Sequence, residues 1–255
     1  MDQLLPFLIV CPLTAVAGFV DTVAGGGGLI SLPAYLIAGV PVHMAIGTNK
    51  VNSVLSNIPA IGSFCKMGYI RLKLAILGIV CGLIGSAAGA QLTMLISEER
   101  FRIIMLILVP VTAVYILGGK VFREEEGAEV VRAVTPKALA LCVLITLVIG
   151  IYDGFYGPGS GVFYLLLLVS VAGFSVREAN GLCKVVMFCT NFAGTAVFLL
   201  HGQILWPLGL AAGVTQMLGS AVGARFFVKN GAHSTKPITL VVLAIFFIKM
   251  LLELR

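Results

Sequence analysis

Four ionisable side chains lie within apolar stretches of the chain: Asp21, Lys50, Asp153 and Lys184. A charge at membrane depth costs at least ~2.5–3.5 kcal/mol on insertion scales, so it is normally paired or lines a pathway. One Asp and one Lys of this kind occur in each half of the chain. Three interpretations stay open: structural Asp–Lys pairs, lysines that extend to the lipid headgroups, and residues that bind or couple a ligand.

Each of these aspartates is followed, after a short gap, by a cluster of glycines: Gly25, Gly26, Gly27 and Gly28 in the first half, and Gly157, Gly159 and Gly161 in the second. A half-helix that begins inside the membrane exposes unpaired N–H groups and the positive end of its dipole. Glycine lets the backbone approach a ligand closely, and the combination binds anions. The alternative is a tight turn between two helices.

Asparagine amides add polar groups to the segments that carry the lysines, at Asn49, Asn52, Asn57 and Asn191. Of these, Asn49, Asn57 and Asn191 are the candidate contacts. Such amides bridge helices or contact an oxyanion. We therefore expect the glycines, lysines and asparagines to bind a small anion, and Asp21 or Asp153 to couple protons. Neither a nucleophile with its base nor a metal-ligand spacing is evident, so the sequence predicts no enzyme, no metal and no cofactor.

The composition is that of a polytopic membrane protein. Of 255 residues, 59% are hydrophobic and only 11% are charged, and the mean hydropathy is +1.08. A soluble domain carries roughly 25% charged residues. The partner implied is therefore a lipid bilayer. We interpret the net charge of +6 as a signal of membrane orientation and expect no nucleic-acid partner.

Apolar runs bounded by turns or charges predict an all-α fold of ten transmembrane segments: 3–20, 27–39, 44–66, 72–96, 102–118, 136–153, 159–172, 178–200, 205–226 and 236–252. The second and seventh segments cover only about 20 Å of a core of about 30 Å. Each of the two therefore begins or ends inside the bilayer, with its glycines at the N-terminal end.

The two halves of the chain are similar to each other. Residues 44–92 align with residues 178–226 at a shift of 134, and about a third of the positions are identical. The sequence therefore predicts a first repeat (1–118), a cytoplasmic linker (119–135) and a second repeat (136–255). Five segments per repeat is an odd number, so the second repeat enters the membrane from the opposite side, as an inverted-topology repeat.

Most lysines and arginines outside the apolar segments fall on one side of this arrangement, which the positive-inside rule assigns to the cytoplasm. Both termini are then periplasmic or extracellular. At 1.5 Å per residue, the first glycine cluster lies at the depth of Lys184, and the second at the depth of Lys50. We therefore predict that each cluster pairs with the lysine of the other repeat.

The blocks 18–33 and Gly47-Thr-Asn-Lys50, the closing Gly85-Ser-Ala-Ala-Gly-Ala90 and their second-half counterparts resemble the TauE/SafE sulfite exporter family, also called the toluene sulfonate uptake permease family. The resemblance covers nearly the whole chain. It implies a bacterial or archaeal inner-membrane carrier for small sulfur-containing anions such as sulfite or sulfonates. The second half departs from the pattern with Gly-Leu-Cys-Lys184, so the two halves are expected to contribute unequally.

The sequence thus predicts a secondary transporter of the cytoplasmic membrane that moves a small sulfur-containing anion by alternating access, coupled to an ion gradient. An anion channel and a carrier for a non-sulfur organic anion remain as alternatives. The substrate, the direction of transport and the oligomeric state are left open.

Overall fold

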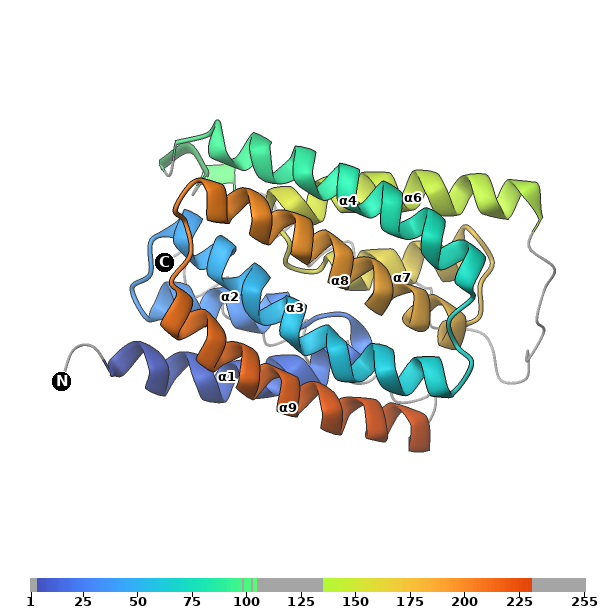
Figure 1. Ribbon diagram of the computed structural model, residues 1–255, viewed down its shortest axis with the longest axis horizontal. Coiled ribbons are helices and arrows are strands. Elements are labelled where there is room, and N and C mark those ends of the chain that lie inside the picture. The colour runs from blue at the N-terminus through green and yellow to red at the C-terminus, as the bar shows by residue number, and fades with distance from the viewer. Residues whose placement is uncertain (1–3, 98, 102, 105–134, 231–255) are drawn as a thin grey trace.

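The computed structural model describes the chain apart from residues 1–3, 98, 102, 105–134 and 231–255 (Figure 1). All regular structure in the described part is helical. The helices are α1 (Leu5–Ala24), α2 (Gly28–Ile37), α3 (Val42–Lys66), α4 (Leu72–Met94), α6 (Pro136–Phe155), α7 (Ser160–Ser170), α8 (Val176–Leu200) and α9 (Trp206–Asn230).

Most of the predicted segments have a counterpart among these helices. The first differs most, because α1 continues past residue 20 and carries Asp21 in its last turn. An ion pair with Lys184 allows that charge inside the helix. The predicted segments 102–118 and 236–252 and the linker 119–135 lie almost entirely outside the described residues.

The lengths of the helices confirm a multi-pass membrane protein with two short helices. In the described chain, α1, α4, α6 and α8 are long and apolar enough to cross a membrane. The helices α3 and α9 have 25 residues each but are less apolar. With 10 and 11 residues, α2 and α7 span only about 15 Å.

The helices of the first half (α1–α4) pack against those of the second half (α6–α9). The closest neighbours are α1 with α9 and α4 with α6, while α3 and α8 lie together at the centre and also contact α9 and α4. In chain order, the counterparts in the two halves are α1 and α6, α2 and α7, α3 and α8, and α4 and α9. Exchanging each helix for its counterpart leaves this pattern of neighbours unchanged.

Glycines allow the α4–α6 and α1–α9 backbones to touch. A Cβ atom at Gly89 would lie 2.0 Å from the Ile151 carbonyl oxygen, and one at Gly219 would lie 1.8 Å from that of Ala15. Side chains cannot be accommodated at such separations. These small residues serve helix packing, as the Gly-xxx-Gly spacing predicts.

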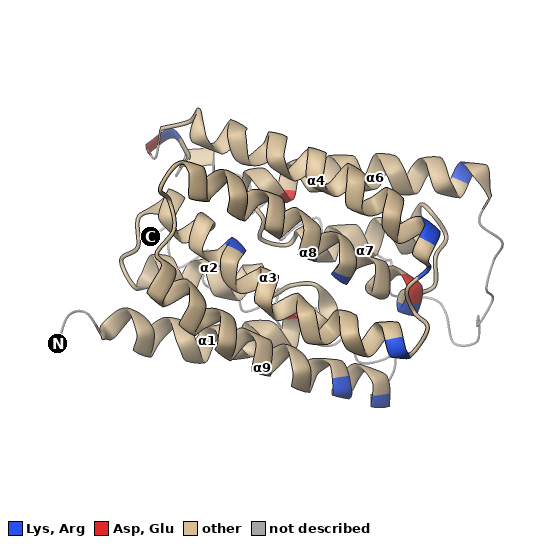
Figure 2. Cartoon of the chain, in the orientation of Figure 1, with Lys and Arg blue, Asp and Glu red and all other residues tan. Residues whose placement is uncertain are grey.

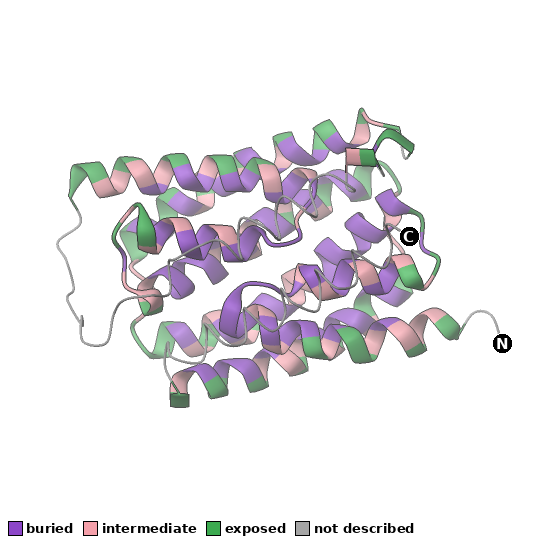
Figure 3. Ribbon diagram, turned by 180° about the vertical axis from the view of Figure 1, so that it is seen from behind, coloured by how far each residue is buried: buried purple, intermediate pink, exposed green. Residues whose placement is uncertain are grey.

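Burial follows the pattern of a protein in lipid. Large apolar side chains such as Leu8, Ile84 and Leu218 are exposed on the outer helices, whereas Lys50 and Lys184 are fully buried. Figure 3 shows exposed residues along the outer helices and buried ones at the centre. Charged residues gather towards the helix ends, with few near the middle (Figure 2).

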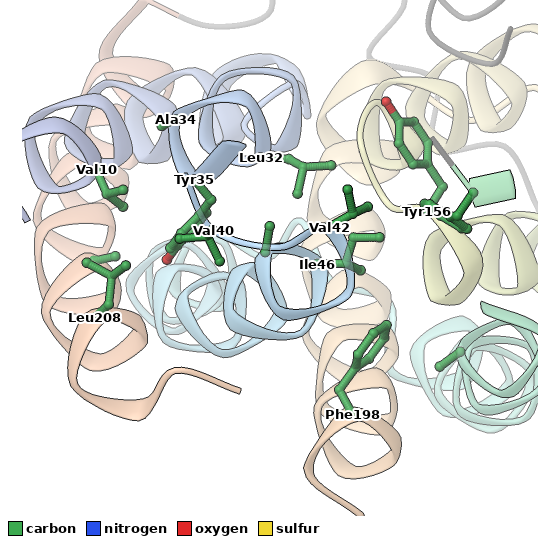
Figure 4. Packing of buried hydrophobic residues seen from close by; sticks show 14 of the residues in the cluster. Val10, Leu32, Ala34, Tyr35, Val40, Val42, Ile46, Tyr156, Phe198 and Leu208 are labelled. Carbon is green, nitrogen blue, oxygen red and sulfur yellow. The ribbon is translucent and has the colours of Figure 1, made fainter. Parts of the chain in front are cut away.

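Each short helix is embedded in its own apolar cluster. The fully buried Tyr35 of α2 belongs to a cluster that includes Val10 of α1, Ile46 of α3 and Leu208 of α9 (Figure 4). The fully buried Tyr164 of α7 belongs to a second cluster with α4, α6 and α8. These clusters hold the two helix starts at the centre of the bundle.

We expect Gly89→Ala to destabilise the α4–α6 contact by about 1–3 kcal/mol, because the added methyl group overlaps a backbone carbonyl. The matched control is Gly62→Ala in α3, where no atom lies within 4 Å of the added Cβ. Its effect should be neutral or stabilising by up to about 1 kcal/mol. Thermal unfolding in detergent measures both; equal losses of stability would contradict this packing.

Candidate functional site

Two interruptions of the helices meet at the centre of the molecule. The first lies between α1 and α2, where Gly25 has a φ of 76°; in the second, between α6 and α7, Gly157 and Gly159 have φ values of 96° and 81°. These left-handed conformations favour glycine. A Cβ at Gly25 would lie 2.6 Å from the Gly161 carbonyl carbon, so the two glycine clusters are in backbone contact.

Lys50 of α3 pairs with Asp153 in the last turn of α6. The Lys50 Nζ donates to Asp153 Oδ2 at 2.8 Å and also to the Asp153 main-chain carbonyl oxygen. The Ser160 hydroxyl, in the first turn of α7, donates to Asp153 Oδ1 at 2.6 Å. The Lys50 and Asp153 side chains are only 2% and 3% exposed, so this pair is sealed within the protein.

Lys184 of α8 pairs with Asp21 in the same manner. Its Nζ donates to Asp21 Oδ2 at 2.8 Å and to the Asp21 carbonyl oxygen. The Gly27 N–H, at the start of α2, donates to Asp21 Oδ1 at 3.2 Å. Lys184 is fully buried, but the Asp21 side chain is 18% exposed. The two pairs therefore differ in their access to solvent.

The start of α8 is fixed by charged contacts at its N-terminus. Ser175 and Glu178 form a reciprocal cap, in which the Ser175 hydroxyl accepts from the Glu178 N–H and the Glu178 carboxylate accepts from the Ser175 N–H. Glu178 also forms a salt bridge with Arg71, which precedes α4. These contacts set the depth of Lys184, which lies two turns further along α8.

Each ion pair matches the helix dipoles around it. The ammonium lies at the C-terminal, negative end of α1 or α6, and the carboxylate lies at the N-terminal, positive end of α2 or α7. An unpaired buried charge costs several kcal/mol. The aspartate carboxylates therefore lie at the two helix starts where the sequence predicts a negative solute.

The predicted pairing between the two halves is confirmed. Asp21, which precedes the first glycine cluster, contacts Lys184 of the second half, whereas Asp153 contacts Lys50 of the first. Gly157 lies beside Lys50 as well, since a Cβ at Gly157 would be 3.2 Å from the Lys50 Nζ. Both lysines are therefore engaged by aspartates inside the protein and do not extend to the lipid headgroups.

A small cavity lies between α3, α8 and the two helix breaks. Its volume is about 30 Å³, measured as the space open to the centre of a water molecule. This is room for about two waters. Its lining contains these predicted residues: Asp21, Gly25, Gly28, Asn49, Lys50, Asn57, Asp153, Gly157, Gly159, Gly161 and Asn191. Gly26, Gly27 and Lys184 are not part of the lining.

Sequence reasoning missed three lining residues: Ser53, Ser160 and Met187. Ser160 stands between two of the predicted glycines, so its position was available as a signal. Ser53 follows Lys50 by three residues and precedes Asn57 by four, which places all three on one face of α3. Met187 carries no polar signal that would single it out.

The asparagine amides are oriented by their own helices. Asn57 Nδ2 donates to the Ser53 carbonyl oxygen at 2.8 Å, and Asn191 Nδ2 donates to that of Met187 at 2.6 Å. Neither amide nitrogen bridges two helices through these bonds. Within the described residues there is no group of three or more His, Cys, Asp or Glu side chains placed to hold a metal ion.

A double-mutant cycle tests the pairing between the halves. Lys50→Met and Asp153→Asn should each cost about 3–5 kcal/mol, because each leaves a buried charge unpaired, and the double variant should cost less than their sum. Lys50→Met with Asp21→Asn is the matched control, since these residues are not partners, and its costs should add. Chemical unfolding in detergent gives the free energies; equal coupling in both cycles would refute the assigned partners.

Comparisons with known proteins place the chain in a family. Residues 10–250 match the family described as "Sulfite exporter TauE/SafE". The "Probable membrane transporter protein ORF9" of Sinorhizobium sp is 36% identical over 251 residues, which is 98% of this chain and 94% of that protein.

Two further relatives carry names of the same kind. The "Probable membrane transporter protein YfcA" of Escherichia coli K12 is 32% identical over 93% of this chain and 86% of its own. A "Probable membrane transporter protein" of Haemophilus influenzae is 32% identical over 93% of this chain and 91% of that protein. No solved structure was found to match. Because the family match and the first relative cover nearly the whole sequence, this chain belongs to the TauE/SafE sulfite exporter family of membrane transporters.

Proposed function

We propose that the protein is a secondary transporter that moves a small sulfur-containing anion across the cytoplasmic membrane by alternating access. The observation that carries the proposal is the pair of Lys–Asp contacts at the two helix breaks, around one cavity. Buried charges in a membrane protein mark transport pathways. Broken helices whose N-termini point into the site are the usual means of binding a negative group.

Binding begins when a Lys–Asp pair opens. The anion replaces the carboxylate, so that the lysine ammonium and the first N–H groups of α2 or α7 stabilise the negative charge of the solute. The cavity has room for only about two waters, so it must widen to admit an anion such as sulfite. A site as narrow as this supports a carrier rather than a continuously open channel.

The aspartates provide the coupling. Protonation of Asp21 or Asp153 removes its charge and weakens its hold on the lysine, which then binds the anion. Asp21 is the more exposed of the two and would exchange its proton with water first. Charge balance supports coupling to protons, because the two pairs together are neutral and an added anion needs a compensating proton.

Alternating access follows from the arrangement of the halves. We propose ten membrane spans in a 5+5 inverted-topology repeat, supported by the unchanged contact pattern when the helices of the halves are exchanged. Each half supplies one lysine and one helix break. Rocking one set of helices against the other would open the Lys50 pair towards one side and the Lys184 pair towards the other.

The orientation has its own test. Lysines and arginines cluster where α3 and α9 end and α4, α6 and α8 begin, so we propose that this end is cytoplasmic. Cys65 is exposed next to Lys66 at this end. A variant with Cys65 as its one cysteine should react with a membrane-impermeant maleimide in inside-out vesicles and not in intact cells. The reverse labelling would invert the topology.

Transport should depend on the buried lysines. Lys184→Met should abolish sulfite flux in proteoliposomes driven by a proton gradient, because the anion loses its counter-charge. Lys229→Met, which removes an exposed lysine at the end of α9, is the control and should transport normally.

A second variant separates folding from function. Lys184→Met combined with Asp21→Asn removes both charges of the pair, so its stability should recover towards that of the wild type while transport stays absent. Normal flux in a stable double variant would show that the pair is structural only.

A further inference from the structure

Two buried oxygen atoms at the cavity lack a hydrogen-bond partner. They are Asn49 Oδ1 and Asn57 Oδ1, and both residues line the cavity. Asn49 is 6% exposed and Asn57 is 2% exposed. A buried acceptor left unsatisfied costs about 1–3 kcal/mol. These oxygens therefore call for a donor from whatever occupies the cavity.

The orientation of the Asn57 amide is fixed. Its nitrogen donates to the Ser53 carbonyl oxygen, and turning the amide over would place two oxygens against each other. Asn57 Oδ1 therefore remains an acceptor. The Lys50 ammonium and the Ser160 hydroxyl, which also line the cavity, are both engaged by Asp153.

Each of the two asparagines lies at about the depth of one Lys–Asp pair. Asn49 adjoins Lys50 in the sequence. The side chain of Lys50 contacts Gly194 of α8, and Lys184 is ten residues, about 15 Å, back along that helix. The helices α3 and α8 run in opposite directions, so a step back along α8 and a step forward along α3 lead towards the same end of the molecule. Asn57 lies about 10 Å forward of Lys50 along α3. Asn57 is therefore close in depth to Lys184 and Asp21.

We propose that the transported anion carries a hydrogen-bond donor, a hydroxyl or amino group, and that the oxygens of Asn57 and Asn49 select for it. This inference rests on the proposed transport function and narrows its substrate class. A lysine released from its aspartate binds the negative group, while the amide oxygen accepts from the donor on the same molecule. An anion without a donor would exclude water from the cavity and leave the oxygens unpaired, which strongly favours a ligand that carries a donor.

The test compares two sulfonates with the same number of non-hydrogen atoms, 2-hydroxyethanesulfonate and propane-1-sulfonate. The purified protein should bind the hydroxyl compound at least about tenfold more tightly by titration calorimetry, as expected for one unsatisfied buried acceptor. In Asn57→Ala or Asn49→Ala the ratio should fall towards one.

Asn180→Ala is the matched control. Asn180 is 1% exposed and also has an unpartnered Oδ1, but its nitrogen donates to the Thr22 carbonyl oxygen and it does not line the cavity. This variant should keep the full preference.

Equal binding of the two sulfonates by the wild type would overturn the inference, as would a preference that survives in both Asn49→Ala and Asn57→Ala. A different failure, in which neither sulfonate nor sulfite binds, would instead overturn the proposed anion site on which the inference rests.

Discussion

The structure depends on the ion pairs between a lysine of one half and an aspartate of the other, each at a break in a helix. A helix that stops inside a membrane leaves a negative and a positive dipole end without solvent. Here the lysine ammonium stabilises the negative C-terminal end of one helix, and the aspartate carboxylate stabilises the positive N-terminal end of the next. Three buried charges, the partly exposed Asp21 and two broken helices thus stabilise one another, because an unpaired charge inside the protein is costly.

This constraint explains the interleaving of the two halves. Each ion pair requires α3 or α8 to lie beside the helix break of the opposite half. The two central helices α3 and α8 therefore lie together, and α9 and α4 of the opposite halves pack against them. Glycines allow these approaches: Gly25 touches Gly161 at the breaks, and Gly194 makes room for the chain of Lys50. Each lysine is neutralised by its aspartate, and the transport that we propose exchanges this internal carboxylate for an external anion.

Much of this was predictable from the sequence. The charges, the glycine clusters and even the partners across the halves follow from helix rise and depth, because a transmembrane helix converts residue number into height. Lateral contacts do not follow from height. The backbone contact between the glycine clusters, the bond of Ser160 to Asp153 and the Asp21 carboxylate at the start of α2 depend on tertiary packing. The sequence therefore predicted helix N-termini that are free to bind a ligand. In the structure, the carboxylates of Asp21 and Asp153 occupy these helix N-termini.

The most direct measurement is a structure determined with sulfite or a sulfonate bound. The account predicts that the anion contacts the first N–H groups of α2 or α7 and the Nζ of Lys184 or Lys50, with the partner aspartate displaced beyond hydrogen-bond distance from that lysine. An anion bound elsewhere, with both the Lys50–Asp153 and Lys184–Asp21 pairs intact, would contradict it.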